Sequence, residues 1–423
     1  MRVINSWNLA SGAKLVVEEI PYVKSAAIGI YIRLGSRYET MKLSGASHFI
    51  EHMLFKGTAD RTAKDIADSF ESMGGQLNAA TSKENTVLYA RVLDENLYSA
   101  MDILFDMLFH SALTPQDFST EKGVIIEEIN MYEDTPDDLV HDIFAQNIWK
   151  HSPMGPPILG TLETITNSER DELFAFYKSF YVPSNIVISV AGNVDATKVR
   201  DAVEAHLEKA QPGSVSIDLE VPELAVPFVK LVPKETEQVQ ICLGVPGITY
   251  HDDRRYALNI MNSILGGGVS SRLFQSIREE MGLAYSIYSY PNNYSDTGSY
   301  VIYAGTGPSR IGQFFEVLQG QLAGLVENGI SEEELTRTRQ QIKSSLYLGM
   351  ESVMNRMTRL GKSLLMYDKI IPLDDVIDKI LSIEKNMIDS LATEILQPAK
   401  ISLSAIGSPE ALKTVDEEFK RYW

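Results

Sequence analysis

The sequence of 423 residues has one cysteine, an excess of acidic over basic residues and no long apolar run. A single cysteine, Cys242, excludes an internal disulfide and a cysteine-based metal site. No apolar stretch reaches the roughly 18 residues that a transmembrane helix needs, and the first residues lack a signal-peptide core. Because 57 acidic residues outnumber 38 basic ones, the formal net charge is −19, which argues against nucleic acid and membrane surfaces as partners. We therefore expect a cytoplasmic protein.

The chain carries an internal duplication with a period of roughly 210 residues, far longer than a solenoid repeat. Strand patterns of the first half recur in the second half; they cover 13–19, 25–33, 86–92 and 186–191, then 238–246, 284–290, 299–304 and 401–407. Residues 211–227 are rich in proline and acidic residues, which is typical of a linker. We predict domains at 1–210 and 228–423. Strands and helices do not strictly alternate, so we expect an α+β fold with two mostly antiparallel sheets packed with helices.

Two further stretches have helical periodicity. One runs from Pro115 to Asn147 and predicts long helical structure there. The other covers Arg272 to Met281 in the second half. Both are expected to be helical over these ranges.

The strongest chemical signal is the pentad from His48 to His52, which reads His-Phe-Ile-Glu-His. On a helix that opens at Ser44 and closes near Gly57, His48 and His52 leave the same face, within reach of one zinc ion. Glu51 lies beside them, where a carboxylate can take a proton from an attacking water and hand it to a leaving amine. The pattern H-x-x-E-H is that of the inverzincins. Alternatively, the two histidines are ordinary members of an amphipathic helix.

The second half does not repeat this chemistry. When Gly57 is aligned with Gly267, the positions opposite the two histidines and Glu51 are Leu258, Met261 and Asn262. Histidines that served only packing would be expected to keep polar equivalents. We infer that one half carries a site and the other does not.

A catalytic zinc ion needs a third protein ligand and an open position. Glu121 and Glu128 are seven residues apart, two helical turns, and so share a face, whereas Glu127 points about 100° away from Glu128. One of these carboxylates can bind the metal and another can orient a ligand histidine. Charged helices also show such acidic pairs without any metal.

These motifs resemble the M16 (pitrilysin-like) zinc metallopeptidases, at the family's spacing and over nearly the whole chain. The resemblance implies the LuxS/MPP-like metallohydrolase fold, with Zn²⁺ held by His48, His52 and Glu128. It implies that Glu51 is the catalytic base and that Glu121 orients a ligand histidine. The length is similar to that of the short subfamily, which includes bacterial processing proteases and the β subunit of the mitochondrial processing peptidase.

Two further matches to the family are weaker. Asn78, Ala79 and Ala80 resemble the strand to which a peptide substrate adds through main-chain hydrogen bonds, although Asn78 also suits an ordinary hairpin. In the second half, Arg278 and Tyr285 are similar to an Arg–Tyr pair that positions the peptide and stabilises the oxyanion. The glycines at 266–268 resemble a family loop, or simply end a helix.

The resemblance implies a zinc endopeptidase acting on short or unfolded peptides inside an enclosed chamber. Larger relatives carry four repeat units, which form two bowls. Because this chain has two units, we expect a homodimer with composite active sites. The alternative is a non-catalytic peptide-binding or assembly subunit of a processing-peptidase-like complex, against which the complete ligand set speaks.

Overall fold

The computed structural model describes residues 3–216 and 219–423. It divides into two compact units, each built from three stretches of chain. Unit 1 contains Met1–Asn130, Pro156–Leu219 and Leu346–Ile371, and unit 2 contains Met131–Gly155, Glu220–Ser345 and Pro372–Trp423. Each unit therefore includes a segment from the other half of the sequence, which the simple division at 211–227 did not foresee. Residues 217 and 218 of the expected linker lie outside the described residues.

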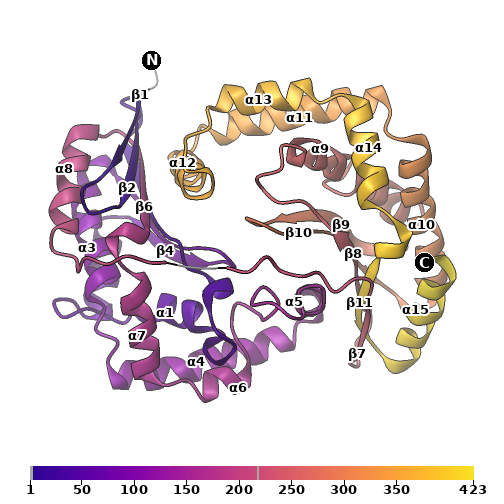
Figure 1. Cartoon of the computed structure of the whole chain (residues 1–423), viewed down its shortest axis with the longest axis horizontal. Coiled ribbons are helices and arrows are strands. Elements are labelled where there is room, and N and C mark those ends of the chain that lie inside the picture. The colour runs from indigo at the N-terminus through magenta and orange to yellow at the C-terminus, as the bar shows by residue number, and fades with distance from the viewer. Residues whose placement is uncertain (1–2, 217–218) are drawn as a thin grey trace. The chain divides into compact units, whose positions relative to one another are not determined.

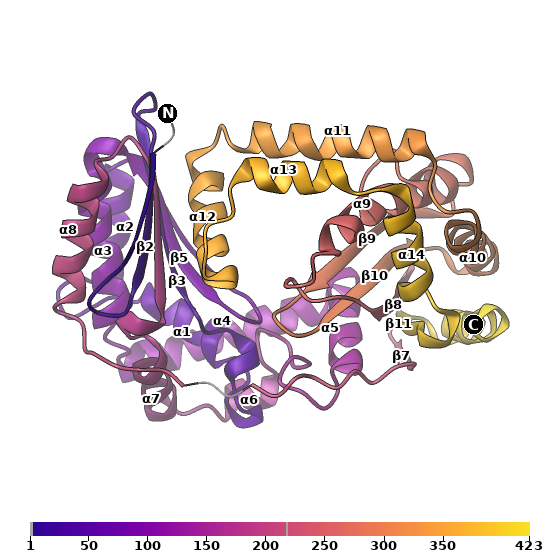
Figure 2. The same cartoon turned by 45° about the horizontal axis from the view of Figure 1, so that its top comes forward.

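Unit 1 is built on a six-stranded sheet. The strands, in spatial order, are β1 (Val3–Asn8), β2 (Lys14–Glu19), β6 (Ile186–Gly192), β3 (Ser25–Ile32), β5 (Thr86–Leu93) and β4 (Gln76–Thr81). Only the β2–β6 pair is parallel among these neighbours of the described sheet. Helices α3 (Leu97–His110) and α8 (Ala196–Leu207) cover one face, and α12 (Val353–Tyr367) covers the other, as Figure 2 shows.

Both faces of the central strands β2, β6 and β3 are buried, and these strands alternate between two cores. Leu15 and Ile28 belong to the core under α3 and α8, whereas Val16 and Ala27 belong to the core under α12. Successive strand residues point to opposite faces, so a strand covered on both sides must be apolar at every position. This accounts for the continuous apolar run of β3 rather than a polar–apolar alternation.

Unit 2 repeats the sheet of unit 1 without its first strand. The order is β7 (Val229–Pro233), β11 (Ser402–Gly407), β8 (Val239–Pro246), β10 (Gly298–Thr306) and β9 (Ala284–Asn293). Again one pair, β7–β11, is parallel and the other described pairs are antiparallel. Helix α5 (Pro136–Ile148) packs on β8 and β11 (Figure 1). The matching strand orders confirm the predicted α+β fold with two repeated sheets.

The remaining helices of the two units complete these layers. In unit 1 they are α1 (Ala46–Leu54), α2 (Ala63–Ser72), α6 (Leu162–Thr166), α7 (Arg170–Phe180) and α4 (Pro115–Glu133), whose last residues, from Met131, fall in unit 2. In unit 2 they are α9 (Arg255–Leu265), α10 (Ile311–Asn328), α13 (Leu373–Ser382), α14 (Lys385–Ile395) and α15 (Pro409–Tyr422). Helix α11 (Glu332–Gly349) runs from unit 2 into the segment that unit 1 takes.

Two helical predictions need correction. The pattern from Pro115 to Asn147 forms two helices, because the chain leaves the helix after Glu133 and Pro136 opens α5 at its first turn. Proline has no N–H to donate within a helix and restricts the residue before it, so it starts a new helix rather than continuing the old one. The pattern from Arg272 to Met281 contains a π-helix at Phe274–Glu280, not a regular α-helix throughout.

The structure also bears on membrane insertion. Within 3–216 and 219–423, no helix has the length and apolar character needed to cross a bilayer.

Candidate metal centre and active site

Helix α1, which carries the pentad, begins at Ala46 and not at Ser44. Gly45 precedes it with φ 95°, in the left-handed region that glycine adopts without strain. The carboxylate of Glu39 accepts hydrogen bonds from the backbone N–H groups of Gly45 (2.7 Å) and Ser47 (2.6 Å). Burial raises the pKa of Glu39 to about 7, despite these hydrogen bonds. Glu39 thus caps the helix from outside the usual capping spacing, which is why sequence reasoning missed it.

Three side chains meet between α1 and α4, the helix that carries both glutamates. Glu128 Oε2 lies 3.8 Å from His48 Nε2 and 3.6 Å from His52 Nε2. One ligand atom from each residue can be chosen so that all lie within 4.8 Å of one another. The two imidazole rings, four residues apart on α1, have centroids 4.5 Å apart. The i, i+4 spacing and the two-turn face of α4 therefore bring the predicted donor atoms together.

The donor atoms are suited to a metal ion. In a tetrahedral zinc site with bonds of ~2.0–2.1 Å, neighbouring ligand atoms lie roughly 3.4 Å apart, close to the distances from Glu128 to the two histidines. Within the described ranges, Glu128 Oε2 and His48 Nδ1 are buried and lack a hydrogen-bond partner. Burial, followed by the neighbouring His52, lowers the pKa of His48 to about 3, so its imidazole is neutral. A neutral imidazole and an unpartnered carboxylate oxygen fit the donor set of zinc.

Glu121 lies behind His52, one of the three donor residues. His52 Nδ1 is 2.7 Å from Glu121 Oε1, so a proton on Nδ1 can be donated to the carboxylate and Nε2 keeps its lone pair. Lys56 Nζ lies 2.5 Å from the other oxygen of Glu121. Glu121 is 3% exposed. The buried carboxylate of Glu121 therefore contacts both His52 and the ammonium group of Lys56, just after the end of α1. The sequence analysis had not identified Lys56 as part of the site.

Glu51 points to the strand beside α1 instead of joining the three donor atoms. Thr81 Oγ1, at the end of β4, donates a hydrogen bond to Glu51 Oε2. Burial raises the pKa of Glu51 above its ordinary value, although the hydrogen bond from Thr81 lowers it in part. A carboxylate with a raised pKa next to the candidate metal centre suits proton transfer.

The residues of the expected substrate strand lie in β4, the outer strand of the unit 1 sheet next to β5. Asn78 and Ala80 are exposed, and Ala79 is buried. The Asn78 side-chain oxygen accepts a hydrogen bond from the N–H of Ala79 (2.8 Å). An outer strand of this kind is what a peptide needs to add to a sheet.

Arg278 and Tyr285 lie in unit 2, and the structure brings them together there. The Arg278 guanidinium lies 4.9 Å from the Tyr285 ring centroid and 4.7 Å from that of Phe274. Arg278 belongs to the π-helix, and Tyr285 is 77% exposed. The Arg–Tyr contact therefore exists within one unit, as a cation–π pair.

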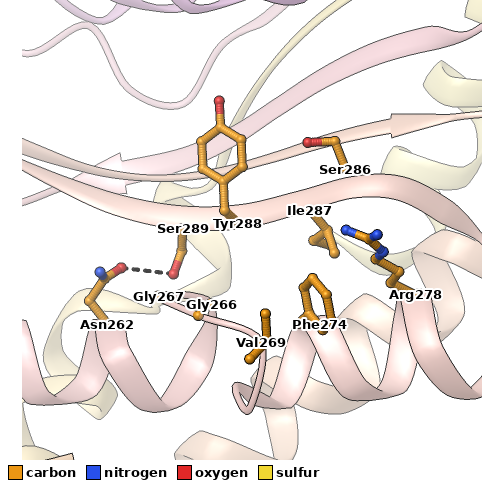
Figure 3. A pocket seen from close by; sticks show the side chains of 11 residues that line it. Asn262, Gly266, Gly267, Val269, Phe274, Arg278, Ser286, Ile287, Tyr288 and Ser289 are labelled. Carbon is orange, nitrogen blue, oxygen red and sulfur yellow. Dashed lines mark hydrogen bonds between the residues drawn. The ribbon is translucent and has the colours of Figure 1, made fainter. Parts of the chain in front are cut away.

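Arg278 also lines a cavity of about 400 Å³ (Figure 3). Asn262 lines it, and its side-chain oxygen accepts a hydrogen bond from Ser289 Oγ (2.8 Å). Gly266 ends α9, and a Cβ atom there would meet Ser289 Oγ at 2.5 Å. The first glycine of the 266–268 run thus acts as a helix end packed closely against β9.

Sequence comparison identifies the family. A profile described as "Insulinase (Peptidase family M16)" matches residues 14–162, and one described as "Peptidase M16 inactive domain" matches 167–342. A Bacillus subtilis protein named "Uncharacterized zinc protease YmxG" is 43% identical over 393 residues, 93% of this chain and 96% of the relative. An uncharacterized zinc protease of Streptomyces coelicolor is 40% identical over 407 residues, 94% and 88% of the two chains. The chain belongs to the M16 family of peptidases.

Solved structures share the fold. A protease from Helicobacter pylori matches with a TM-score of 0.90 at 20% identity, covering 96% of this chain and all of that chain. A Pseudomonas fluorescens protein described as a peptidase M16 inactive domain matches with a TM-score of 0.89 at 19% identity, over 96% and 98%. At this identity the likeness shows the architecture alone.

Proposed function

We propose that this chain is a zinc-dependent endopeptidase that hydrolyses short or unfolded peptides. The observation that carries the proposal is the convergence of His48, His52 and Glu128, with Glu51 held beside them at the outer strand. The family and the zinc-protease names of its relatives support the same activity.

The chain's own residues have distinct roles in this reaction. His48, His52 and Glu128 would hold the zinc ion, and Glu121 would keep the His52 ring oriented. Zinc bound there would polarise the scissile carbonyl as a Lewis acid. Glu51 accepts a proton from the attacking water and donates it to the leaving amine, so that one water molecule is consumed for each peptide bond. Strand β4, with Asn78 to Ala80, would hold the peptide extended by main-chain hydrogen bonds.

The decisive experiment separates metal binding from proton transfer. Glu51→Gln should keep roughly one zinc per chain and lose about 10²–10⁴-fold in turnover of a quenched peptide, since its role is proton transfer. His48→Ala, His52→Ala and Glu128→Gln should each lose zinc and activity together, and a chelator should abolish wild-type cleavage. A wild-type protein that binds zinc but cleaves no member of a peptide library would instead support the non-catalytic peptide-binding or assembly subunit.

The proposal extends to the assembly. Two chains would pair as a homodimer that encloses a chamber, with the zinc residues of one protomer facing Arg278 and Tyr285 of the other; the resemblance to larger four-unit relatives supports this arrangement. Mixing Glu51→Gln with Arg278→Ala/Tyr285→Phe should restore up to about a quarter of wild-type activity, because half the dimers are mixed and each holds one intact site of two. No recovery despite demonstrated subunit exchange would contradict composite sites. The cytoplasmic location also stays a prediction, which cell fractionation tests.

A further inference from the structure

The carboxylate of Glu51 is held by Thr81, the residue that follows Ala80 in the expected substrate strand. Thr81 is the last residue of β4. Its hydroxyl donates a hydrogen bond to Glu51 Oε2. The base on α1 is thus attached to the end of the outer strand.

The proton of the Thr81 hydroxyl has a defined direction. The other polar neighbour of this hydroxyl among the described residues is Thr86 Oγ1, at 3.5 Å. Thr86 donates its own proton to the carbonyl oxygen of Leu34 (2.8 Å), and Thr86 is fully buried. Because Thr86 does not need the Thr81 proton, that proton is available to Glu51, and the bond is one from a hydroxyl to a charged acceptor.

These hydrogen bonds place Glu51 at the open edge of β4. The N–H of Ala79 donates to the Asn78 side chain, so it points away from β5. Along an antiparallel strand, N–H groups of alternate residues face the same side, so those of Leu77, Ala79 and Thr81 share the open edge. Glu51 is bonded to the hydroxyl of Thr81, the last of these three residues. A peptide that added to this edge would meet Glu51 where the strand ends.

We propose that Thr81 is a positioning residue for the hydrolysis proposed above: it fixes Glu51 at the end of the peptide-binding edge, where the scissile bond leaves the strand. The inference rests on the proposed function. It requires the Thr81 hydroxyl to affect turnover and not metal binding, since its hydrogen-bond partners in the described chain are Glu51 and Thr86 and not the three donor residues.

The test compares three variants of the full-length zinc-loaded protein on a quenched peptide. Thr81→Val keeps the β-branched shape and the backbone N–H but removes the hydroxyl. Its kcat should fall roughly tenfold or more, as for a lost hydrogen bond to a charged group, with KM within about twofold of wild type. Thr81→Ser should recover kcat to within about threefold of wild type, because it restores the donor. Thr393→Val is the matched control, since this exposed hydroxyl bonds to its own helix, through the carbonyl of Asp389.

Each outcome has a defined meaning. Wild-type kcat in Thr81→Val, or failure of Thr81→Ser to recover it, overturns the inference. So does loss of zinc, or a melting temperature several degrees below that of Thr393→Val, because Thr81 would then be a structural residue. Glu51→Gln, assayed in parallel, separates the two claims. An active Glu51→Gln refutes the proposed function itself, whereas an inactive Glu51→Gln with a fully active Thr81→Val refutes the positioning role alone.

Discussion

The two helices of the candidate metal centre are joined by a pair of stacked rings, Phe49 and Phe118. Phe49 lies next to His48 on α1, and Phe118 lies one turn before Glu121 on α4. The ring centroids are 4.8 Å apart and the planes differ by 2°, with Phe49 0% and Phe118 7% exposed. The stack therefore fixes the distance between the histidines and the glutamates, and its removal should weaken both folding and zinc binding.

The magnitude follows from burial. Truncation of a buried phenylalanine to alanine costs about 3–5 kcal/mol, of which the ring–ring contact supplies roughly 0.5–1.5 kcal/mol. Phe49→Ala should lower the free energy of unfolding of the metal-free protein by this amount. Phe118→Leu keeps most of the apolar volume and should cost about 1.5 kcal/mol or less. Zinc affinity should fall at least about tenfold in Phe49→Ala, because the donor atoms are no longer held in place. A tenfold loss of affinity corresponds to ~1.4 kcal/mol of binding free energy.

Urea unfolding followed by circular dichroism gives the first quantity, and competition with a chromogenic chelator gives the second. Phe314 of α10 is the matched control, because it is equally buried and belongs to unit 2. Phe314→Ala should cost a similar free energy of unfolding and leave zinc affinity unchanged. The reasoning is refuted if Phe49→Ala binds zinc as tightly as wild type, or if Phe314→Ala weakens zinc binding equally.

Three further predictions concern single ion pairs. Glu121→Gln should weaken zinc affinity about 10–100-fold in chelator competition, and unchanged affinity would remove Glu121 from the metal centre. Burial raises the pKa of Glu334, but hydrogen bonds from Arg272 and the Ser331 N–H outweigh it and lower the pKa from 4.5 to about 2. The stabilisation that ionised Glu334 contributes to the fold is therefore complete above pH 4.5 and is lost as the pH falls towards 2. Between pH 4.5 and 2, the free energy of unfolding should fall more steeply in wild type than in Glu334→Gln. Glu18 and Arg356 form a buried ion pair between β2 and α12. Glu18→Ala should lower the free energy of unfolding in urea by about 3–5 kcal/mol, because it leaves Arg356 buried without its partner, whereas the double variant Glu18→Leu/Arg356→Met should recover most of that loss. Equal losses in the single and the double variant would contradict the pairing argument.

The spacing of residues along the sequence was enough to predict the fold class and the grouping of the main site residues. Four-residue and seven-residue intervals on helices place side chains on one face whatever the rest of the fold does, so the grouping of His48 with His52 and of Glu121 with Glu128 could be predicted. The α+β class followed in the same way from apolar periods that recur in both halves. Glu121 Oε1 lies 2.7 Å from His52 Nδ1, and its role in orienting that ring stays a prediction.

Only the tertiary structure decided which segments from distant parts of the chain meet. The exchange of α5 and α12 between units could not be read from the sequence, because an amphipathic helix does not specify which of two similar sheets it covers. The same holds for Thr81 and Glu51, which are separated by 30 residues, and for Lys56 and Glu121. Such contacts depend on how strands and helices pack, and packing is a property of the whole unit and not of any local pattern.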